Sequence, residues 1–461
     1  MVSVLARGAL FQIQLFLDRT ISIGLFFILA GVPFIINPFA LDYWYKPKID
    51  SVYALIAIIA AAALTRQLVL KKLPCVSVHP LTMPLAAYAV ASILATIFSV
   101  SPSVSIHGDI FREEGLVTLL AYISLTIIFA TAVVSEKQLK DLLTALLVSG
   151  SLVSLYALVQ YAGYNPTRHF LPLLRSVENR PGSTIGNCNF LGKFLVLLLP
   201  LFIVYYLMTE KRVEKLLLAA GCLVSVAALI VTFTRASWVS FIVSLIMLLI
   251  MLRGTLMWKR VKHLCVIAAG LIVVFVLVVG YKPAGENAAA QEKTLDRITK
   301  RIALTFDLQK GGIAGRLYLW RKAITLIGDR PVIGYGPDTH ALVMDRFNLE
   351  YARKFNCSGL LDRAHNNYLD IAIAQGLLGL AAYLAIIITF LVWLVRTLKT
   401  EPDATRQLLY RGILAAVCGY LLNDIFTFSV VSVSPTFWSL LGLTLSIKRC
   451  NVLVQPLCDK T

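Results

Sequence analysis

The feature that most constrains this 461-residue chain is a succession of apolar runs, each long enough to cross a membrane. A hydrocarbon core of about 30 Å needs about 20 apolar residues in a helix. Hydrophobic residues make up 58% of the chain and charged residues only 15%, which is too apolar for a water-facing surface. We therefore predict an all-α integral membrane protein.

Length and apolar content predict roughly twelve transmembrane helices. Their expected spans are 20–38, 50–64, 82–99, 116–134, 140–162, 189–208, 215–233, 236–252, 263–280, 367–395, 410–428 and 434–447. The second and the last are short, so each is also compatible with a tilted, interfacial or re-entrant segment. The first twenty residues lack a cleavage site after a short apolar core, and they indicate an amphipathic lead-in rather than a cleavable signal.

The formal net charge of +18 is explained by the placement of the basic residues. Segments such as 209–215 and 253–263 are rich in Lys and Arg, and such loops are typically cytoplasmic. This rule predicts that both termini are cytoplasmic and that segment 281–365 is external, since long segments are translocated largely regardless of charge. Cytoplasmic basic residues meet anionic lipid, so we expect contact with membrane lipids and none with nucleic acid.

Segment 281–365 is too long and too varied in composition for a simple connection. Apolar residues at helical spacing predict a helix over 314–327, and the Gly and Pro residues of 328–338 predict turns. We expect a small external subdomain with short helices. The chain then divides into transmembrane helices 1–9 (residues 1–280), the external subdomain (281–365), and transmembrane helices 10–12 with a cytoplasmic tail (366–461).

The strongest local pattern lies where the external segment enters the next predicted helix. His365 and Asn366 stand at this boundary. After nine intervening residues comes Gly376, and three positions further comes Gly379. Helix structure alone explains such a pattern, because Asn366 or Asn367 can cap the helix and the glycines allow a neighbour to pack closely. A single histidine at a membrane boundary is not specific to any function.

The spacing supports a second interpretation. Residues 365–379 fit the signature His-[Asn/Ser/Gln]-x9-Gly-x-x-[Gly/Thr/Tyr] at every specified position. The chain therefore resembles the superfamily of O-antigen ligases, O-antigen polymerases and related oligosaccharyltransferases, and most of all its ligase branch. Segments 180–201, 232–241 and 315–338 are similar to further motifs of the superfamily, with Cys188 in place of the usual proline. The resemblance extends over about residues 110–445.

This resemblance implies a donor glycan carried on undecaprenyl diphosphate, whose phosphates need cations. Arginine suits that role because its N–H fork matches phosphate oxygens and it never loses its proton. The arginines at external helix ends or in the external segment are Arg112, Arg180, Arg235, Arg316 and Arg321. Arg180, Arg235 and Arg316 match the superfamily motifs best, although Trp320 replaces the leucine expected after Arg316. The alternative is that each arginine is a snorkelling anchor.

The acceptor must supply a nucleophile, normally a sugar hydroxyl, and a nearby base assists its attack. Histidine has a pKa near neutral pH, and the resemblance assigns this role to His365, with Asn366 orienting it or contacting sugar. The implied reaction is a single displacement with inversion at the anomeric carbon. The motifs also imply supporting positions, which are Asn187, Asn189, Gly376 and Gly379.

Two charged residues, Lys193 and Asp424, fall inside predicted membrane helices. We expect Asp424 to support the site by positioning one of the arginines, and a structural polar contact is the alternative. The external acids do not form the paired pattern of metal-dependent glycosyltransferases. Neither a metal nor a cofactor is therefore predicted, and Glu113 and Glu114 are expected in a solvated loop.

The leading hypothesis is a glycosyltransferase of the bacterial inner membrane whose active site faces the periplasm or exterior. A ligase would use a lipid A-core sugar in lipopolysaccharide biosynthesis or another cell-envelope acceptor. A polymerase would use another repeat unit, and a protein O-oligosaccharyltransferase would use Ser or Thr. A transporter is the rival from another class, but it would place polar residues at mid-membrane depth. The donor sugar, the envelope type, the oligomeric state and a Cys188–Cys357 disulfide are left open.

Overall fold

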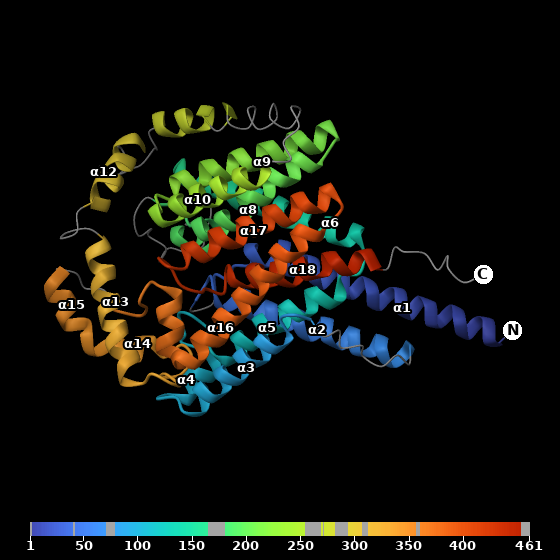
Figure 1. The fold of residues 1–461 in the computed structure, drawn as a ribbon, viewed down its shortest axis with the longest axis horizontal. Coiled ribbons are helices and arrows are strands. Elements are labelled where there is room, and N and C mark those ends of the chain that lie inside the picture. Colours follow the sequence, from blue (N-terminus) through green and yellow to red (C-terminus); the bar gives the residue numbers. More distant parts are fainter. Residues whose placement is uncertain are drawn as a thin grey trace.

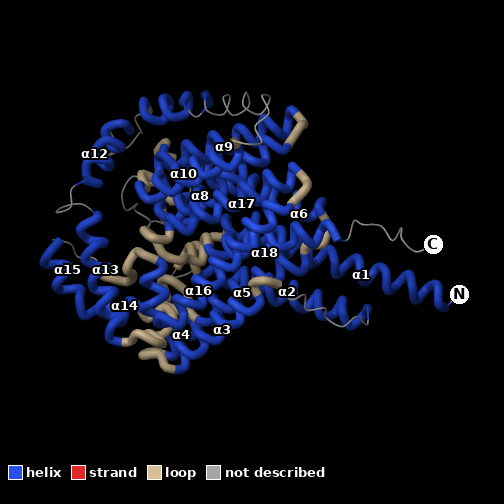
Figure 2. Tube along the Cα trace, viewed as in Figure 1, coloured by secondary structure: helices blue, strands red, loops and turns tan. Residues whose placement is uncertain are grey.

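The secondary structure of this chain is entirely helical in the residues that the computed structural model describes. These are 2–39, 42–70, 79–164, 180–253, 269–270, 272–281, 294–306, 312–355 and 360–452. No strand occurs among them, and Figure 2 shows helices joined by loops. The predicted all-α class is confirmed for this part of the chain. Cys357 lies outside the described residues, and so does its proposed disulfide with Cys188.

The long helices carry most of the apolar sequence. They are α1 (Val2–Phe26), α2 (Lys46–Leu70), α3 (Thr82–Ile97), α5 (Leu116–Ala132), α6 (Glu136–Tyr161), α8 (Cys188–Met208), α9 (Arg212–Val231), α10 (Arg235–Leu252), α16 (Asn367–Thr400), α17 (Ala404–Asn423) and α18 (Ser434–Val452). The short helices η1 (Phe27–Gly31) and η2 (Val32–Phe34) extend α1, α4 (Pro102–His107) precedes α5, and η3 (Ser183–Ile185) precedes α8. The segment 281–365, which the sequence predicts to be external, contains α12 (Thr294–Phe306), α13 (Gly312–Asp329), α14 (His340–Met344), η4 (Asp345–Phe347) and α15 (Asn348–Phe355).

Seven helices of the described residues are long and apolar enough to cross a membrane. They are Leu10–Phe34, Lys46–Leu70, Glu136–Tyr161, Cys188–Met208, Arg212–Val231, Arg235–Leu252 and Asn367–Thr400. Helices α3 and α5 are apolar but shorter. These helices support a multi-pass membrane protein. The total of twelve spans and the cytoplasmic side of the termini stay predictions, and most of the expected span 263–280 lies outside the described residues.

The second helix is longer than the sequence predicted. The expected span 50–64 is the middle of α2, which has 25 residues and is long enough to cross the membrane upright. The extra residues at the start of α2 include Lys48, a charged residue that precedes the apolar run but is fully buried. Its ammonium group donates hydrogen bonds to the carbonyl oxygens of Ile35 (2.7 Å) and Thr184 (2.9 Å), so the helix continues past it.

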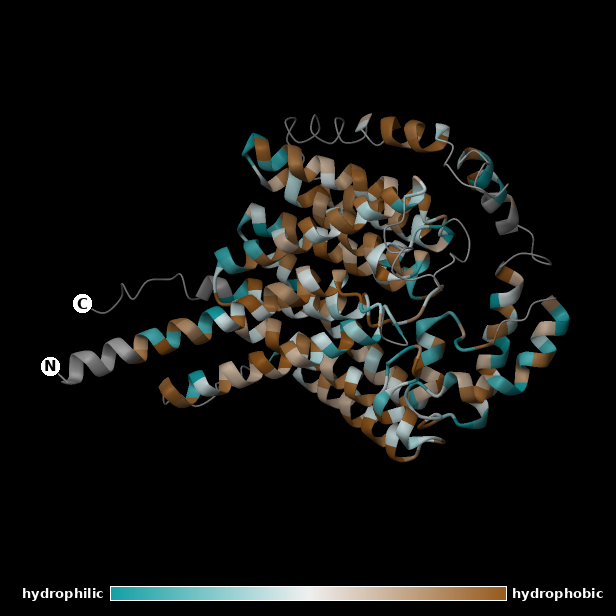
Figure 3. Ribbon diagram, turned by 180° about the vertical axis from the view of Figure 1, so that it is seen from behind, coloured by the Kyte–Doolittle hydropathy of each residue, from teal (hydrophilic) through white to brown (hydrophobic). Residues whose placement is uncertain are grey.

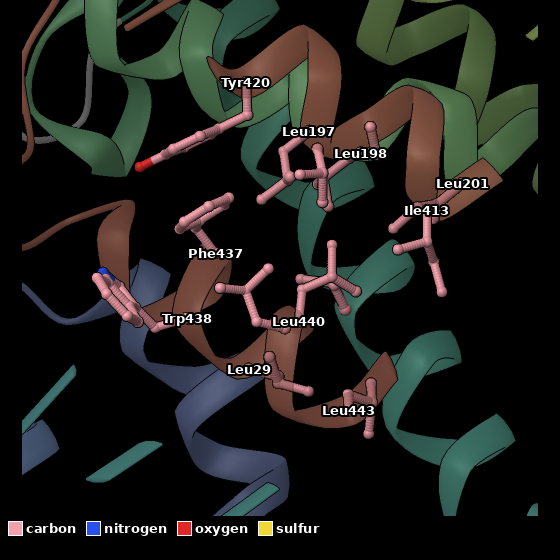
Figure 4. Packing of buried hydrophobic residues seen from close by; sticks show 14 of the residues in the cluster. Leu29, Leu197, Leu198, Leu201, Ile413, Tyr420, Phe437, Trp438, Leu440 and Leu443 are labelled. Carbon is pink, nitrogen blue, oxygen red and sulfur yellow. The ribbon is translucent and has the colours of Figure 1, made fainter. Parts of the chain in front are cut away.

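Helix α8 forms the centre of the bundle. All its residues from Phe190 to Leu207 are buried, and it packs against α9, α10 and α17. Figure 4 shows Leu201 of α8 beside Ile413 of α17. A helix that is apolar all round must lie inside a protein or membrane. The polar residues before and within its first turn are therefore held by a rigid core.

Helices α13, α14 and α15 gather at one end of the bundle (Figure 1). Figure 1 shows α13, α14 and α15 at the end opposite to the start of α1 and the end of α18. Hydrophilic residues lie at both ends of the bundle and hydrophobic ones between them (Figure 3). The helix predicted at 314–327 is confirmed as α13, and turns follow it from 330 to 338. Many of the loops lie where this end meets the bundle, which is where the candidate residues converge (Figure 2).

Candidate active site

His365 is held tightly in the loop that leads into α16. Its φ is 53°, a left-handed conformation that costs a residue other than glycine about 1–3 kcal/mol. The preceding N–H, that of Ala364, donates to the carboxylate of Asp370 (2.8 Å). The following side chain, that of Asn366, caps α16 by accepting from two N–H groups of its first turn (3.1 and 3.2 Å). The capping interpretation of Asn366 is therefore confirmed, and both neighbours of His365 are anchored.

The surroundings of His365 favour its neutral form. Burial lowers the pKa of the imidazole, and the carboxylate of Asp362 opposes this shift only in part. The positive charges of Arg316, Arg112 and Arg363 lower the pKa further. A neutral imidazole has a free lone pair and can accept a proton, which is what a general base requires. The structure thus brings two of the predicted arginines, Arg112 and Arg316, close to the predicted base.

The ring of Phe428 forms a platform beneath this group. The centroid of the His365 ring lies 5.3 Å from that of Phe428. The guanidinium groups of Arg112 and Arg363 lie over the same ring, at 5.0 and 5.7 Å from its centroid. Cations are attracted to the face of an aromatic ring, so Phe428 orders both arginines beside the histidine. Nothing in the sequence distinguished Phe428 from other apolar residues.

Arg316 and Arg235 form a second positive centre. Arg316 is half-buried on α13, and both burial and the neighbouring charge of Arg235 lower its pKa. Among the described residues, no carboxylate forms a salt bridge with Arg316. Its guanidinium lies 5.9 Å from the ring of Phe426, and the indole of Trp320 packs on that ring as well (6.4 Å). Trp320, in place of the expected leucine, thus packs alongside Arg316.

Arg180 connects the first turn of α8 to the start of α10. Its guanidinium donates to the carbonyl oxygen of Thr232 (2.8 Å), the hydroxyl of Thr234 (3.0 Å) and the side-chain oxygen of Asn189 (3.2 Å). The side chain of Asn187 caps α8 by accepting from the N–H of Asn189 (2.8 Å). Because Thr234 directly precedes Arg235, this network fixes the place where Arg235 begins its helix.

The two remaining arginine candidates differ from each other. Arg112 forms a salt bridge with Asp362, with 2.8 Å between Nε and Oδ2. Arg321 is exposed and lies five residues beyond Arg316, which is about 140° around the helix at about 100° per residue. The structure therefore does not bring Arg321 to the same face of α13 as Arg316.

The signature glycines shape α16 differently from the expected continuous helix. Gly376 has a φ of 65° and breaks the helix, and an added Cβ would overlap the carbonyl oxygen of Val332. Around this break the backbone of residues 331–336 pairs with α16, for example through the N–H of Tyr335 and the carbonyl oxygen of Ile373 (2.9 Å). The close neighbour of Gly376 is thus the turn at residues 331–336 rather than another helix. Gly379 instead faces the side chain of Gln375 on its own helix.

The sequence suggested that Asp424 positions one of the arginines, but the structure pairs it with a lysine instead. Asp424 is fully buried and forms a salt bridge with Lys193 of α8, which is also fully buried. The ammonium group of Lys193 also donates to the carbonyl oxygen of Phe428 (3.0 Å). The N–H of Asn367 donates to the carbonyl oxygen of Asp424 (2.8 Å). The salt bridge of Lys193 and Asp424 therefore helps to hold Phe428 and the start of α16 in place.

The expectation of a solvated loop at Glu113 and Glu114 is wrong for Glu114. This carboxylate is buried and accepts hydrogen bonds from the hydroxyls of Tyr122 (3.0 Å) and Ser429 (2.7 Å). Burial raises the pKa of Glu114. A loop residue at a helix start gives no local sign of burial, since α18 and the segment before it supply the cover only in the folded chain.

A buried arginine was missed altogether. Arg363 lies two residues before His365, forms a salt bridge with Asp338 and a hydrogen bond with His340, and is almost inaccessible. Its position just before the signature was the one available signal. Arg363 also lines a cavity of about 60 Å³, whose wall includes Tyr88 and Trp438. Such a space holds a few water molecules at about 10–15 Å³ each and is too small for a sugar ring.

A metal site does not emerge from the part of the chain that the structure describes. No three His, Cys, Asp or Glu side chains in those residues group in a way that could hold a metal ion. The polar centre of the site is built from arginines, the histidines His365 and His340, and the carboxylates of Asp362 and Asp338, which are paired with arginines. Such a set can bind an anion and accept a proton.

Comparison with protein families agrees with this arrangement. Residues 220–384 match a family described as O-antigen ligase, and no curated protein matches the chain. The matched range contains Arg235, Arg316, His365 and the signature glycines. The family supports a ligase- or polymerase-type membrane glycosyltransferase that acts on glycan and lipid substrates. Over residues 220–384 the chain is therefore similar to the O-antigen ligase family, which is consistent with the superfamily of O-antigen ligases and polymerases that its motifs resemble.

Proposed function

We propose that this protein transfers a glycan from undecaprenyl diphosphate to a hydroxyl of a lipid-anchored acceptor sugar. One observation carries the proposal. Arg316 is half-buried beside Arg235, and no carboxylate among the described residues forms a salt bridge with it. Its positive charge also lowers the pKa of His365. Two cations close together in a partly buried place repel each other, so an anion bound between them relieves that cost.

A diphosphate fits this positive centre. Guanidinium groups bind phosphate oxygens through parallel N–H bonds, and they stay charged when desolvated. We assign Arg316 and Arg235 to the donor diphosphate, with Arg112 at its edge and Arg180 holding the start of α10. Arg112 is already paired with Asp362, so it contributes less free positive charge than Arg316.

The chemical step needs one base and one stabilised leaving group. The acceptor oxygen forms a bond to the anomeric carbon while its proton passes to a ring nitrogen of His365. The bond from that carbon to the diphosphate oxygen breaks, and undecaprenyl diphosphate leaves with the new negative charge facing the arginines. A single displacement of this kind inverts the anomeric configuration. No step requires a metal ion or a cofactor.

The proposal places the reaction on the periplasmic or exterior side of a bacterial inner membrane. Support comes from the arrangement of the chain, since α13 and α14 lie at the end opposite to the start of α1 and the end of α18 (Figure 1). With cytoplasmic termini, this end is external, and residues 281–365 are the external part between two membrane-embedded parts. A lipid-linked donor in the outer leaflet would reach the arginines from the membrane side.

The test is transfer by the purified protein in liposomes, with a synthetic undecaprenyl-diphosphate glycan and a panel of acceptors. We expect release of undecaprenyl diphosphate coupled to a lipid-anchored sugar acceptor, with or without a chelator. His365→Ala should abolish transfer, whereas His107→Ala, a change at an exposed histidine, should leave it unchanged.

Each other outcome has a definite meaning. Transfer only to a repeat unit would identify a polymerase, and transfer only to Ser or Thr would identify a protein oligosaccharyltransferase. Transfer by His365→Ala at the wild-type rate would remove the assigned base. Loss of activity in chelator that a divalent ion restores would reject the metal-free step. Solute flux in liposomes without any transfer would instead favour a transporter.

A further inference from the structure

Arg363 lies at the meeting point of three segments that are distant in sequence. It directly precedes Ala364 and His365, and its side chain is only 3% exposed. Its guanidinium forms a salt bridge with Asp338, in the turn before α14. It also binds Nδ1 of His340, the first residue of α14. An arginine buried this deeply must have its charge and its N–H groups satisfied, and both partners come from the external segment.

Asp338 carries the link onward to a third segment. One carboxylate oxygen pairs with Arg363, and the other accepts from the N–H groups of Asp109 (2.6 Å) and Glu114 (3.0 Å). These two residues flank the loop that carries Arg112. The same carboxylate therefore fixes the loop of Arg112 and the segment of His365 relative to each other.

His340 closes a ring of contacts around residues 363 and 364. Its Nδ1 accepts from Arg363, and its Nε2 donates to the carbonyl oxygen of Asp370 (2.8 Å). These partners assign the neutral tautomer with the proton on Nε2. Burial and the charge of Arg363 lower the pKa of His340, in agreement with that form. The carboxylate of Asp370 in turn accepts from the N–H of Ala364 (2.8 Å), so the ring returns to the residue that follows Arg363.

The guanidinium of Arg363 also sets the surface on which the catalytic ring rests. It lies 5.7 Å from the centroid of Phe428, and the His365 ring lies 5.3 Å from the same centroid. Arg363 therefore holds both the backbone before His365 and the aromatic ring beside it. The positive φ of His365 needs such restraint, because a free loop would relax to a less costly conformation.

We propose that Arg363 is the positioning residue of this site, which fixes the proton-accepting His365 by binding Asp338 and His340 of the external segment. It differs from Arg316 in a decisive respect. The charge of Arg363 is matched by a buried carboxylate, so it has no positive charge left to hold a phosphate. Its effect on transfer passes through the geometry of His365, and the activity part of this inference rests on the proposed function.

The main variant is Arg363→Lys, which keeps the charge. A single ammonium group cannot reach two partners in the planar fork geometry of a guanidinium. We expect kcat to fall about 10- to 100-fold, because a displacement of about 1 Å at a catalytic group has effects of that size. The KM for the donor should stay within about twofold. The matched control is Arg346→Lys, at an exposed arginine that pairs with Asp329 (2.7 Å) in the same external segment, and it should behave as wild type.

A second pair of variants protects the test from simple misfolding. In His340→Asn the amide oxygen can occupy the place of Nδ1 and accept from Arg363. In His340→Gln the amide can instead replace Nε2 and donate to the carbonyl oxygen of Asp370. If Arg363 positions His365, His340→Asn should retain more of the wild-type kcat than His340→Gln. Equal kcat values, or the reverse order, would contradict the role of Arg363.

One readout does not depend on transfer. Diethyl pyrocarbonate modifies unprotonated histidines, and mass spectrometry gives the rate at His365 separately. Loss of the contacts that Arg363 makes with Asp338 and His340 should raise this labelling rate at least about threefold in Arg363→Lys but not in Arg346→Lys. The loop of His365 is then free to move and exposes the half-buried ring.

The combined outcomes separate this inference from the proposed function. Active wild type, with a loss of kcat and faster labelling in Arg363→Lys, supports both. Active wild type with unchanged kcat and labelling in that variant overturns the positioning role alone, and so does an effect confined to the KM. If the wild type transfers to no acceptor, the proposed function fails. In that case the labelling rate of His365 alone tests the positioning role. An unchanged rate in Arg363→Lys would overturn it.

Discussion

Arg316 on α13 and Arg235 at the start of α10 are close enough for the charge of Arg235 to lower the pKa of Arg316. These residues are 81 positions apart, and the fold brings them together beside His365. Two guanidinium groups that lie near each other in a half-buried place favour the binding of an anion. The pair is therefore the most direct place to test binding of the donor diphosphate.

Removal of Arg316 should weaken transition-state binding of the donor. A hydrogen bond to a charged group contributes about 1.5–3 kcal/mol, so Arg316→Ala should lower kcat/KM for the donor about 10- to 100-fold. Arg321→Ala should stay within about twofold of wild type, because Arg321 is exposed on another face of the same helix. Steady-state kinetics with a donor series would measure both. Equal losses in the two variants would contradict the assignment of Arg316.

The pH dependence of transfer should reflect the low pKa of His365. Burial and three arginine charges hold this pKa below its ordinary value of about 6.5. The base must be unprotonated, so kcat/KM should be level at neutral pH and fall only on acidification below that value. A bound diphosphate adds negative charge and raises the pKa, so kcat should fall at a higher pH than kcat/KM. Coincident profiles would argue against a diphosphate next to His365.

Gly376 should be the more sensitive of the signature glycines to added bulk. Its φ is 65°, and a Cβ would overlap the carbonyl oxygen of Val332. Gly376→Ala should cost at least about 1–3 kcal/mol in stability, the usual cost of a strained backbone conformation. Gly280→Ala is the control, because a Cβ there meets nothing within 4 Å. Thermal unfolding in detergent would compare them, and similar melting temperatures would refute the pairing of α16 with residues 331–336.

The buried pair of Lys193 and Asp424 should respond differently to single and double substitution. Lys193→Met or Asp424→Asn alone leaves a buried group without its partner and should cost about 3–5 kcal/mol. The double variant Lys193→Met with Asp424→Asn removes both charges and should be more stable than the two single effects added together predict. Denaturant unfolding of the four proteins would give the coupling. Additive effects would mean that the two charges do not stabilise each other.

Local pattern was sufficient for most helices and for the signature. Apolar runs located α5, α8 and α10 to within a few residues, and helical spacing located α13, because the period of a helix is written in adjacent residues. The spacing of His365, Asn366 and the two glycines was readable for the same reason. The start of α2 could not be read in this way, since Lys48 precedes the apolar run but is satisfied by carbonyl oxygens from other segments.

The partners of the charged residues could not be predicted from the sequence. Lys193 and Asp424 are 231 positions apart, and Arg363 and Asp338 are 25 positions apart, so no local period connects them. The sequence offered five arginines as candidates, and only the motif resemblance favoured three of them. The fold separated Arg316, which lies beside Arg235 and His365, from Arg321, which faces elsewhere on the same helix.

The sequence by itself determined that the chain is helical, that it is apolar enough for a membrane, and that it carries the O-antigen ligase signature. Those properties depend on composition and on spacing within about twenty residues. Only the tertiary structure decided which charges meet and that α16 breaks at Gly376. It also decided that Arg363, two residues before the signature histidine, is buried and bound to His340. A buried charge is stable only when a partner reaches it, and that partner is chosen by the packing of the whole chain.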